Sequence, residues 1–210
     1  MLLLIILSVL VLPLLGLLLV VNLLAVGVSG LGFSGFGGIL IVLAVMLGSF
    51  INIPLSKGDV VRVRDRRFFG LLRTKTPVSG GLSINLGGAV IPLFITSILI
   101  PNTPLYPVLI TTVLATLSAY KSSRIIPSIG VVMSPLITVF LVTFSALILA
   151  PENPEAVAFI SGVWGSLIGA DFLNLNRVMR RSGSVMIIGG GGVFDGILLI
   201  GILSSILAGI

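Results

Sequence analysis

The sequence of 210 residues contains no cysteine, no histidine and no glutamine. Without thiolates or imidazoles, the chain has no disulfides, no cysteine–histidine zinc site and no axial haem ligand of either kind. Serine–histidine hydrolysis is also excluded, because no imidazole is present to act as the base. GGGGVFDG at 189–196 is not a Walker A loop, since it lacks the Gly-Lys-Ser/Thr ending. We expect no metal and no cofactor.

Charged residues are scarce: they make up 9% of the chain, against roughly 25% in soluble domains. Hydrophobic residues make up 57%, and the mean hydropathy is +1.31. Apolar runs of about 18 residues, long enough to cross a bilayer, recur along the chain. The composition predicts an all-α polytopic transmembrane helix bundle that forms one domain over residues 1–210.

Apolar runs between charges and Pro/Gly breaks predict seven transmembrane helices. They lie at 1–22, 35–55, 84–100, 105–120, 128–150, 156–175 and 184–210. The first has no basic residue ahead of it, and its apolar core exceeds the roughly 7–15 residues of a signal peptide. We therefore interpret it as a retained helix.

The charges predict an orientation. The twelve basic residues fall in three alternate loops, at 57–75, 121–124 and 177–181, whereas the fifth loop, APENPEA, carries Glu152 and Glu155. Because basic loops stay cytoplasmic, we expect a multi-pass cell-membrane protein with its amino terminus inside, its carboxyl terminus outside and a cytoplasmic basic loop at 56–80. Alternating Val and Arg over 60–64 predict a short strand or hairpin there. The bilayer is the expected partner, and the net charge of +6 reflects insertion rather than nucleic-acid binding.

Asp171 and Asp195 are the acids that fall inside predicted spans. An aspartate at a helix centre costs roughly 2.5–3.5 kcal/mol of insertion free energy. We therefore expect both to face the bundle interior, paired, protonated or in contact with water, and to mark a functional site.

Glycines surround both aspartates. Gly165 and Gly169 precede Asp171, and Gly192 and Gly196 bracket Asp195. Small residues four apart let helices approach closely in lipid, so we expect spans six and seven to form a hairpin. Asp171 and Asp195 would then lie roughly 14 Å and 16 Å from its cytoplasmic end. The run that opens the last span adds further supporting glycines: Gly189, Gly190 and Gly191.

Two facing carboxylates in a partly dry site share a proton, because like charges a few ångströms apart do not both ionise. One can then act as base on a water while the other acts as acid. An intramembrane aspartyl-protease-like hydrolase acting on a membrane peptide is the first hypothesis. A proton- or cation-coupled transporter or channel is the second. A structural subunit of a membrane complex, with the aspartates locking the hairpin, is the third.

Four motifs resemble a family of multi-pass membrane proteins named domain-of-unknown-function family 1614. They are GSFINIPL at 48–55, INLGGAVIP at 84–92, GSLIGADFLNL at 165–175 and GGGGVFDGILLIGI at 189–202. The chain has Gly191 where the family tends to Ala and Val193 where it tends to Thr. The resemblance implies a multi-pass membrane protein and gives no activity.

A weaker resemblance is to the presenilin and signal-peptide-peptidase intramembrane aspartyl proteases, which carry one aspartate on each of two successive helices. Only Asp171 and Asp195 carry over, as catalytic residues by analogy. The flanking residues differ, since Asp171 follows Ala170 rather than Tyr and Asp195 follows Phe194 rather than Gly-x-Gly.

Asparagines are the remaining polar side chains of interest. Asn52 and Asn85 lie in two similar segments, SFINIPL and LSINLGGAVIPL, on either side of the basic loop. This pattern hints at an inverted repeat of the kind that builds transporter sites. For Asn174 and Asn176, near the end of span six, we favour a helix cap or a bond between helices.

Overall fold

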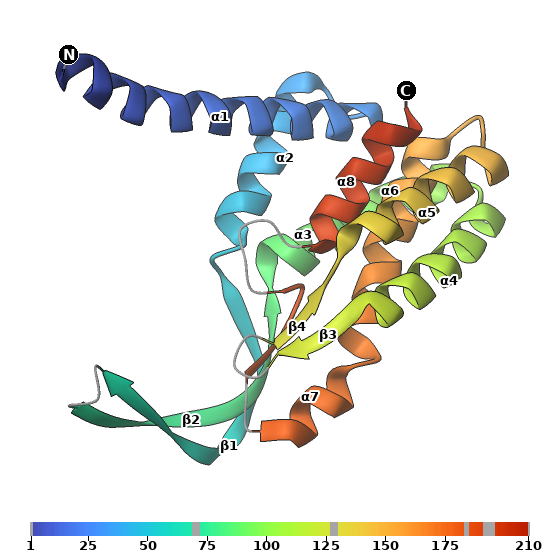
Figure 1. The fold of residues 1–210 in the computed structure, drawn as a ribbon. Coiled ribbons are helices and arrows are strands. Elements are labelled where there is room, and N and C mark those ends of the chain that lie inside the picture. The colour runs from blue at the N-terminus through green and yellow to red at the C-terminus, as the bar shows by residue number, and fades with distance from the viewer. Residues whose placement is uncertain (1, 69–71, 127–129, 183–184, 191–195, 210) are drawn as a thin grey trace.

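The computed structural model describes residues 2–68, 72–126, 130–182, 185–190 and 196–209. Most of the described residues are helical (Figure 1). The amino-terminal half contains, in order, α1 Leu2–Gly30, α2 Gly35–Gly48, β1 Asn52–Phe68, β2 Leu72–Asn85, η1 Leu86–Val90, α3 Ile91–Leu99 and η2 Ile100–Asn102. The rest contains α4 Leu105–Ser122, β3 Ser123–Ile126, β4 Gly130–Met133, α5 Pro135–Leu149, α6 Pro154–Ser166, η3 Leu167–Phe172, α7 Leu175–Ser182, β5 Val185–Ile188 and α8 Gly196–Ala208. Of the short η elements, η1 and η3 are π-helical and η2 is 3₁₀.

The prediction of an all-α chain is wrong, because strands lie at one end of the bundle (Figure 1). The predicted strand at 60–64 is confirmed as part of a long antiparallel hairpin, β1–β2, in which Asn52 pairs with Asn85 and Phe68 with Leu72. Strand β5 adds to β2 in parallel, which gives the order β1-β2-β5, and β3 and β4 form a second small sheet. Valine and isoleucine dominate β3, β4 and β5, as is typical of strands.

The prediction of seven transmembrane helices is also wrong. Among the described residues, one helical segment is long and apolar enough to cross a membrane, Pro154–Met179, which spans 26 residues. A second span results if Leu14–Gly30 and Gly35–Gly48 are counted together, although they are bent by 118°. The apolar runs are interrupted because their polar ends form strands and because Gly and Pro break the helices; α5, for example, has only 15 residues.

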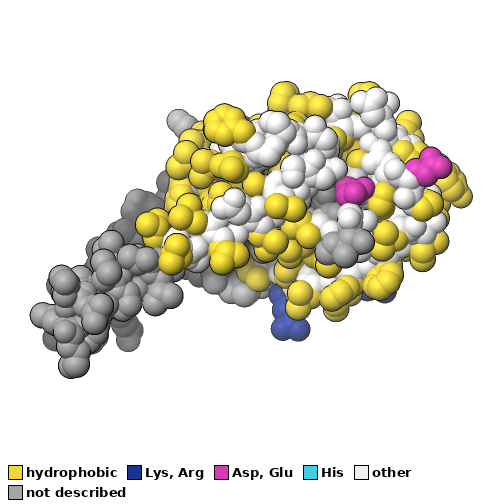
Figure 2. Space-filling view, turned by 90° about the horizontal axis from the view of Figure 1, so that it is seen from above, with side chains coloured by type: hydrophobic (Ala, Val, Ile, Leu, Met, Phe, Trp, Pro, Cys, Tyr) yellow, Lys and Arg dark blue, Asp and Glu magenta, His cyan; other side chains and the backbone are white. Residues whose placement is uncertain are grey.

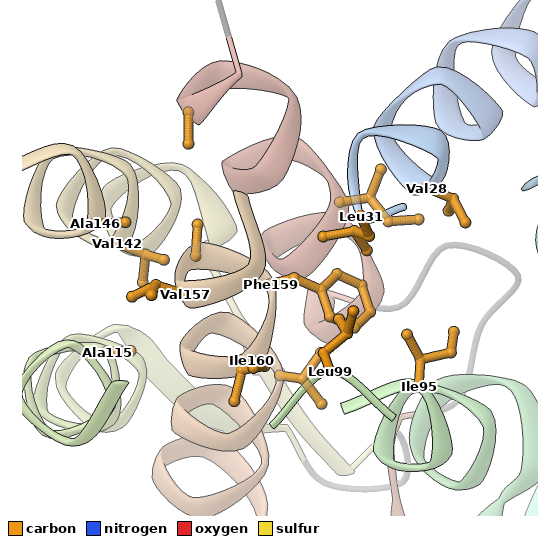
Figure 3. Close-up of a cluster of buried hydrophobic side chains, with 14 of the residues drawn as sticks. Val28, Leu31, Ile95, Leu99, Ala115, Val142, Ala146, Val157, Phe159 and Ile160 are labelled. Carbon is orange, nitrogen blue, oxygen red and sulfur yellow. The ribbon is translucent and has the colours of Figure 1, made fainter. Parts of the chain in front are cut away.

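The core lies where α6 passes between the other helices (Figure 3). Phe159 and Ile160 are fully buried there, beside Val157 on the same helix. Around them pack Val28 of α1 and Leu31 just after it, Ile95 and Leu99 of α3, Ala115 of α4, and Val142 and Ala146 of α5. Helix α6 therefore holds the bundle together, and its carboxyl end carries the candidate site.

Candidate functional site at the junction of the sheet and the helices

The site forms where two parallel strands end side by side. Strand β2 pairs with β5 from Gly81 opposite Val185 to Ile84 opposite Ile188. Since parallel strands end at the same edge of a sheet, Asn85, the last residue of β2, and Gly189, the residue after β5, lie at the same edge. Asn85 leads into η1, and Gly189 begins the glycine turn that precedes α8.

Asn85 is 2% exposed, and its amide makes three hydrogen bonds. Its Oδ1 accepts from the Gly88 N–H at 2.7 Å, which caps the start of η1. Its Nδ2 donates to the Ser49 carbonyl at 2.7 Å and to Asn52 Oδ1 at 2.9 Å. The two asparagines predicted from the repeat therefore meet across the hairpin, and Asn85 ties η1 to the end of α2.

Gly189 contacts both η1 and η3. Its φ of +83° is in the left-handed region, which glycine adopts without a steric penalty. A Cβ at this position would lie 2.6 Å from Ala89 Cβ and 2.9 Å from the Gly88 carbonyl carbon, so the backbone packs directly on η1. Gly190 follows with φ of +75°. Gly189 and Gly190, two of the predicted supporting glycines, thus form a tight turn, and Gly189 packs against η1.

Asp171 lies on η3, the π-helical continuation of α6, and is 5% exposed. Its Oδ2 accepts a hydrogen bond from the Gly189 N–H at 2.7 Å. In the part of the chain that the structure describes, this backbone N–H is the only hydrogen-bond donor to the carboxylate, and no cation pairs with it. An ionised carboxylate out of water is costly unless hydrogen-bond donors or cations compensate its charge, which makes Asp171 the candidate for a functional residue at this junction.

Asn174 fixes the helix end beside Asp171. It is 2% exposed, and its Nδ2 donates to the Ala170 carbonyl at 3.0 Å, to the Gly169 carbonyl at 3.3 Å and to Ser123 Oγ at 2.9 Å. It therefore caps the end of η3 and also links it to the start of β3, as the interpretation of a cap or an inter-helix bond expects. Asn176 is exposed on α7.

The predicted role of Gly165 and Gly169 in bringing spans six and seven together is wrong. Both pack on α4, where a Cβ at Gly165 would clash with Ala115 and one at Gly169 with the Thr116 carbonyl. The close contact between α6 and α8 comes instead from another glycine pair. A Cβ at Gly162 would lie 3.2 Å from the Cα of Gly201. The sequence did not show which glycines face which helix, because Gly162, Gly165 and Gly169 lie on the same helical segment at spacings of three and four residues.

Asp195, Gly191 and Gly192 lie outside the described residues, so their place in the site stays a prediction. Gly196 is the first residue of α8. The pairing of Asp195 with Asp171 is untested for the same reason. Within the described ranges, no group of three or more acidic, histidine or cysteine side chains could hold a metal ion.

Sequence reasoning missed a set of buried hydroxyl groups between α4, α5, α6 and α8. Ser161 Oγ donates to the Val108 carbonyl at 3.1 Å, and Ser204 Oγ donates to the Val139 carbonyl at 3.3 Å. Ser166 Oγ, one residue before η3, and Thr111 Oγ1 are buried without a hydrogen-bond partner among the described residues. The sequence feature that could have revealed these hydroxyl groups is the occurrence of Ser and Thr within apolar helices, where the core of a soluble protein usually has Leu or Val.

The comparisons with known proteins give a family and no activity. The model of the family described as "Protein of unknown function (DUF1614)" matches residues 46–207, which include α2's end, both π-helical turns and all but the end of α8. No curated protein and no solved structure matches, so the presenilin resemblance stays an analogy without further support. Because the match covers well over half of its length, the chain belongs to the DUF1614 family.

Proposed function

We propose that this chain is an integral membrane protein in which Asp171 and Asp195 form an acid pair that performs proton chemistry. The observation that carries the proposal is the buried Asp171 carboxylate, which accepts one backbone N–H bond and meets no cation among the described residues. It lies within the Pro154–Met179 segment, the described segment best suited to span a bilayer.

Membrane embedding is supported by the distribution of side chains along α4. The small or hydroxyl residues Thr111 and Ala115 are buried there, whereas the large apolar side chains of Leu109 and Leu117 face outward. Exposed large hydrophobic side chains also cover α5 and α2. In Figure 2, hydrophobic side chains lie around the rim of the molecule. Lipid favours this pattern, because helix contacts in a bilayer depend on close packing rather than on hydrophobic burial.

The charges agree with a membrane orientation. Lys121, Arg124 and Arg177 lie at the end of the bundle that carries the strands. Glu152, in the turn between α5 and α6, and Glu155, in the first turn of α6, lie at the opposite end. Figure 2 looks onto that face, where acidic side chains are visible. The positive-inside rule then makes the strand end cytoplasmic, as we propose for a cell-membrane protein.

The helix hairpin supports the pairing of the two aspartates. Since Gly162 packs on Gly201 and the two helices run antiparallel, the first residue of α8 is level with about residue 167 of η3. That level is about four residues, or roughly 6 Å along the axis, from Asp171. Asp195 is bonded directly to this first residue, Gly196. The start of α8 is therefore within reach of the Asp171 carboxylate.

The proposed chemistry is hydrolysis of a peptide bond in a membrane substrate. One aspartate takes a proton from a water that attacks the scissile carbonyl, and the other donates a proton to the carbonyl oxygen, which gives a tetrahedral diol. The first aspartate then gives its proton to the amide nitrogen as the C–N bond breaks, and the second takes a proton back from the diol, so that an amine and a carboxylic acid leave and the pair returns to its starting state. Two carboxylates suffice for this reaction, so the absence of histidine and cysteine is compatible with it.

Proton- or cation-coupled transport is a second candidate, favoured by the broken helices. The π-helical turns η1 and η3 and the Gly189–Gly190 turn meet at one junction. Interrupted helices free backbone carbonyls that coordinate ions in transporters. The pairing of Asn52 with Asn85 relates the two similar segments in antiparallel fashion, which fits the inverted repeat.

The test uses the full-length chain reconstituted in liposomes, assayed both for cleavage of membrane-inserted peptides and for proton or cation flux. We expect the protein to show either cleavage or flux, and we expect both Asp171→Asn and Asp195→Asn to abolish that activity. Asp65→Asn on β1 should leave it unchanged. An effect of Asp171→Asn on cleavage alone supports the hydrolase, and an effect on flux alone supports transport. If both variants keep wild-type signals, the aspartates serve only to hold the hairpin, and the proposal fails.

A further inference from the structure

Basic side chains gather at the last turn of α4. Lys121 is exposed there, and Arg124 follows on β3. Arg177 of α7 joins them, because its guanidinium carbon lies 5.4 Å from the centre of the Tyr120 ring. The consecutive elements α4 and β3, together with the distant helix α7, thus place cations near Tyr120 at the strand end of the bundle.

Among the described residues, no acidic side chain neutralises these cations. The Asn174–Ser123 hydrogen bond of 2.9 Å ties the residues just before α7 to the start of β3. The Tyr120 ring then orients Arg177 by a cation–π contact. In the described part of the chain, Lys121, Arg124 and Arg177 form no ion pair, and the nearest described acid along the chain, Asp171, is buried. Their positive charge is therefore available to an external anion.

An apolar track leads to this cluster along α4. Leu109, Val113 and Leu117 are 64%, 58% and 52% exposed. They recur every four residues, and the next residue in the series is Lys121. Residues four apart share one helix face, so the track ends directly at a cation. Phe172 and Leu173, at the end of η3, are also about half exposed and add apolar surface on the neighbouring helix.

We propose that this surface binds one phospholipid with an anionic headgroup, with the phosphate on Lys121, Arg124 and Arg177 and an acyl chain along Leu109–Leu117. Basic pockets next to membrane helices recognise such headgroups by charge, and the apolar track matches the hydrocarbon that follows the phosphate. A soluble phosphate compound would use the cations without the track. The inference relies on the membrane embedding proposed above and is independent of the aspartate chemistry.

The experiment measures lipid retention by the full-length chain. The protein, purified in mild detergent, is mixed with phosphatidylglycerol or phosphatidylcholine of the same acyl chains, and bound lipid is counted by native mass spectrometry. Wild type should retain phosphatidylglycerol preferentially. Lys121→Gln with Arg177→Gln should weaken its binding by about fivefold for each cation removed. The matched control, Arg64→Gln with Arg67→Gln on β1, removes the same charge elsewhere and should leave retention unchanged.

A second pair of variants tests the acyl track. Val113→Ser with Leu117→Ser should weaken lipid retention, whereas Leu136→Ser with Ile137→Ser, equally exposed on α5, should not. The lipid site would be overturned if the protein retained both lipids equally, or if the two double variants that remove basic residues lost the same amount of lipid. Displacement of the lipid by inorganic phosphate at equal concentration would also overturn it. Extraction of the chain by alkaline carbonate would instead overturn membrane embedding itself, so the two failures are distinguishable.

Discussion

The two π-helical turns, η1 and η3, lie at the same junction but differ in the polar side chain that each carries. At η1 the neutral amide of Asn85 both donates and accepts, and it makes three hydrogen bonds. At η3 the carboxylate of Asp171 can only accept when it is ionised, and a single backbone N–H reaches it among the described residues. A buried amide can satisfy its donors and its acceptor with neutral partners, whereas a buried ionised carboxylate carries a charge that must be compensated. This difference is the reason for proposing η3, rather than η1, as the chemical site.

The largest expected effect comes from Gly189, which contacts both turns. Gly189→Ala forces an alanine into a left-handed conformation and places its Cβ 2.6 Å from Ala89 Cβ. We expect a loss of about 3–4 kcal/mol in the free energy of unfolding. Unfolding in detergent, followed by the fluorescence of the single tryptophan, Trp164, measures it.

Gly32→Ala provides the control for this effect. Gly32 has a similar φ of +92°, but a Cβ added there would meet no described atom within 4 Å. It should lose only about 1–2 kcal/mol, from backbone strain alone. Equal losses in the two variants would show that Gly189 does not link the turns.

The second effect tests the closed junction. Asn85→Ala removes three hydrogen bonds and leaves the Ser49 carbonyl and the Gly88 N–H without their Asn85 partner. We expect the unfolding free energy to fall by about 3 kcal/mol. Asn85→Asp keeps the acceptor for the Gly88 N–H but loses the two hydrogen bonds that Nδ2 donates, so it should also destabilise the protein substantially. The reverse exchange at η3, Asp171→Asn, should not. Urea or SDS titration of the helical circular dichroism signal would measure both.

The third effect separates stability from function at η3. In Asp171→Asn the side-chain oxygen still accepts from the Gly189 N–H, and the buried charge is removed. We expect the unfolding free energy to change by no more than about 1 kcal/mol, while the activity proposed for the reconstituted protein is lost. Asp171→Ala, which removes the acceptor, should be less stable than Asp171→Asn. A strongly destabilised Asp171→Asn would mean that η3, like η1, is a structural junction.

The smallest effect concerns the serines beside the two turns. Ser49 Oγ, next to η1, donates to the Val45 carbonyl at 2.7 Å, whereas Ser166 Oγ, next to η3, is buried without a partner among the described residues. Ser49→Ala should therefore lose about 1 kcal/mol, and Ser166→Ala should be neutral or slightly stabilising. Thermal unfolding of both variants under one detergent condition gives the comparison. A larger loss for Ser166→Ala would indicate a water bound at η3.

The sequence by itself determined the apolar character of the chain and the strand in the basic segment. It also showed that the basic residues fall in other loops than Glu152 and Glu155, and it selected Asp171 as a candidate. These properties follow from composition and local pattern, because burial of charge is costly wherever the chain folds. Membership of the DUF1614 family was likewise readable from short motifs around Asn52, Asn85 and Asp171.

Only the tertiary structure decided how many helices are long enough to span a bilayer, which glycines face which helix, and what Asp171 contacts. Gly165 and Gly169 are indistinguishable from Gly162 by spacing, yet they pack on α4 while Gly162 packs on α8. The Asn52–Asn85 bond and the Gly189–Asp171 bond join residues 33 and 18 positions apart. Such contacts depend on strand pairing and helix packing, which are non-local, so no local pattern of residues specifies them.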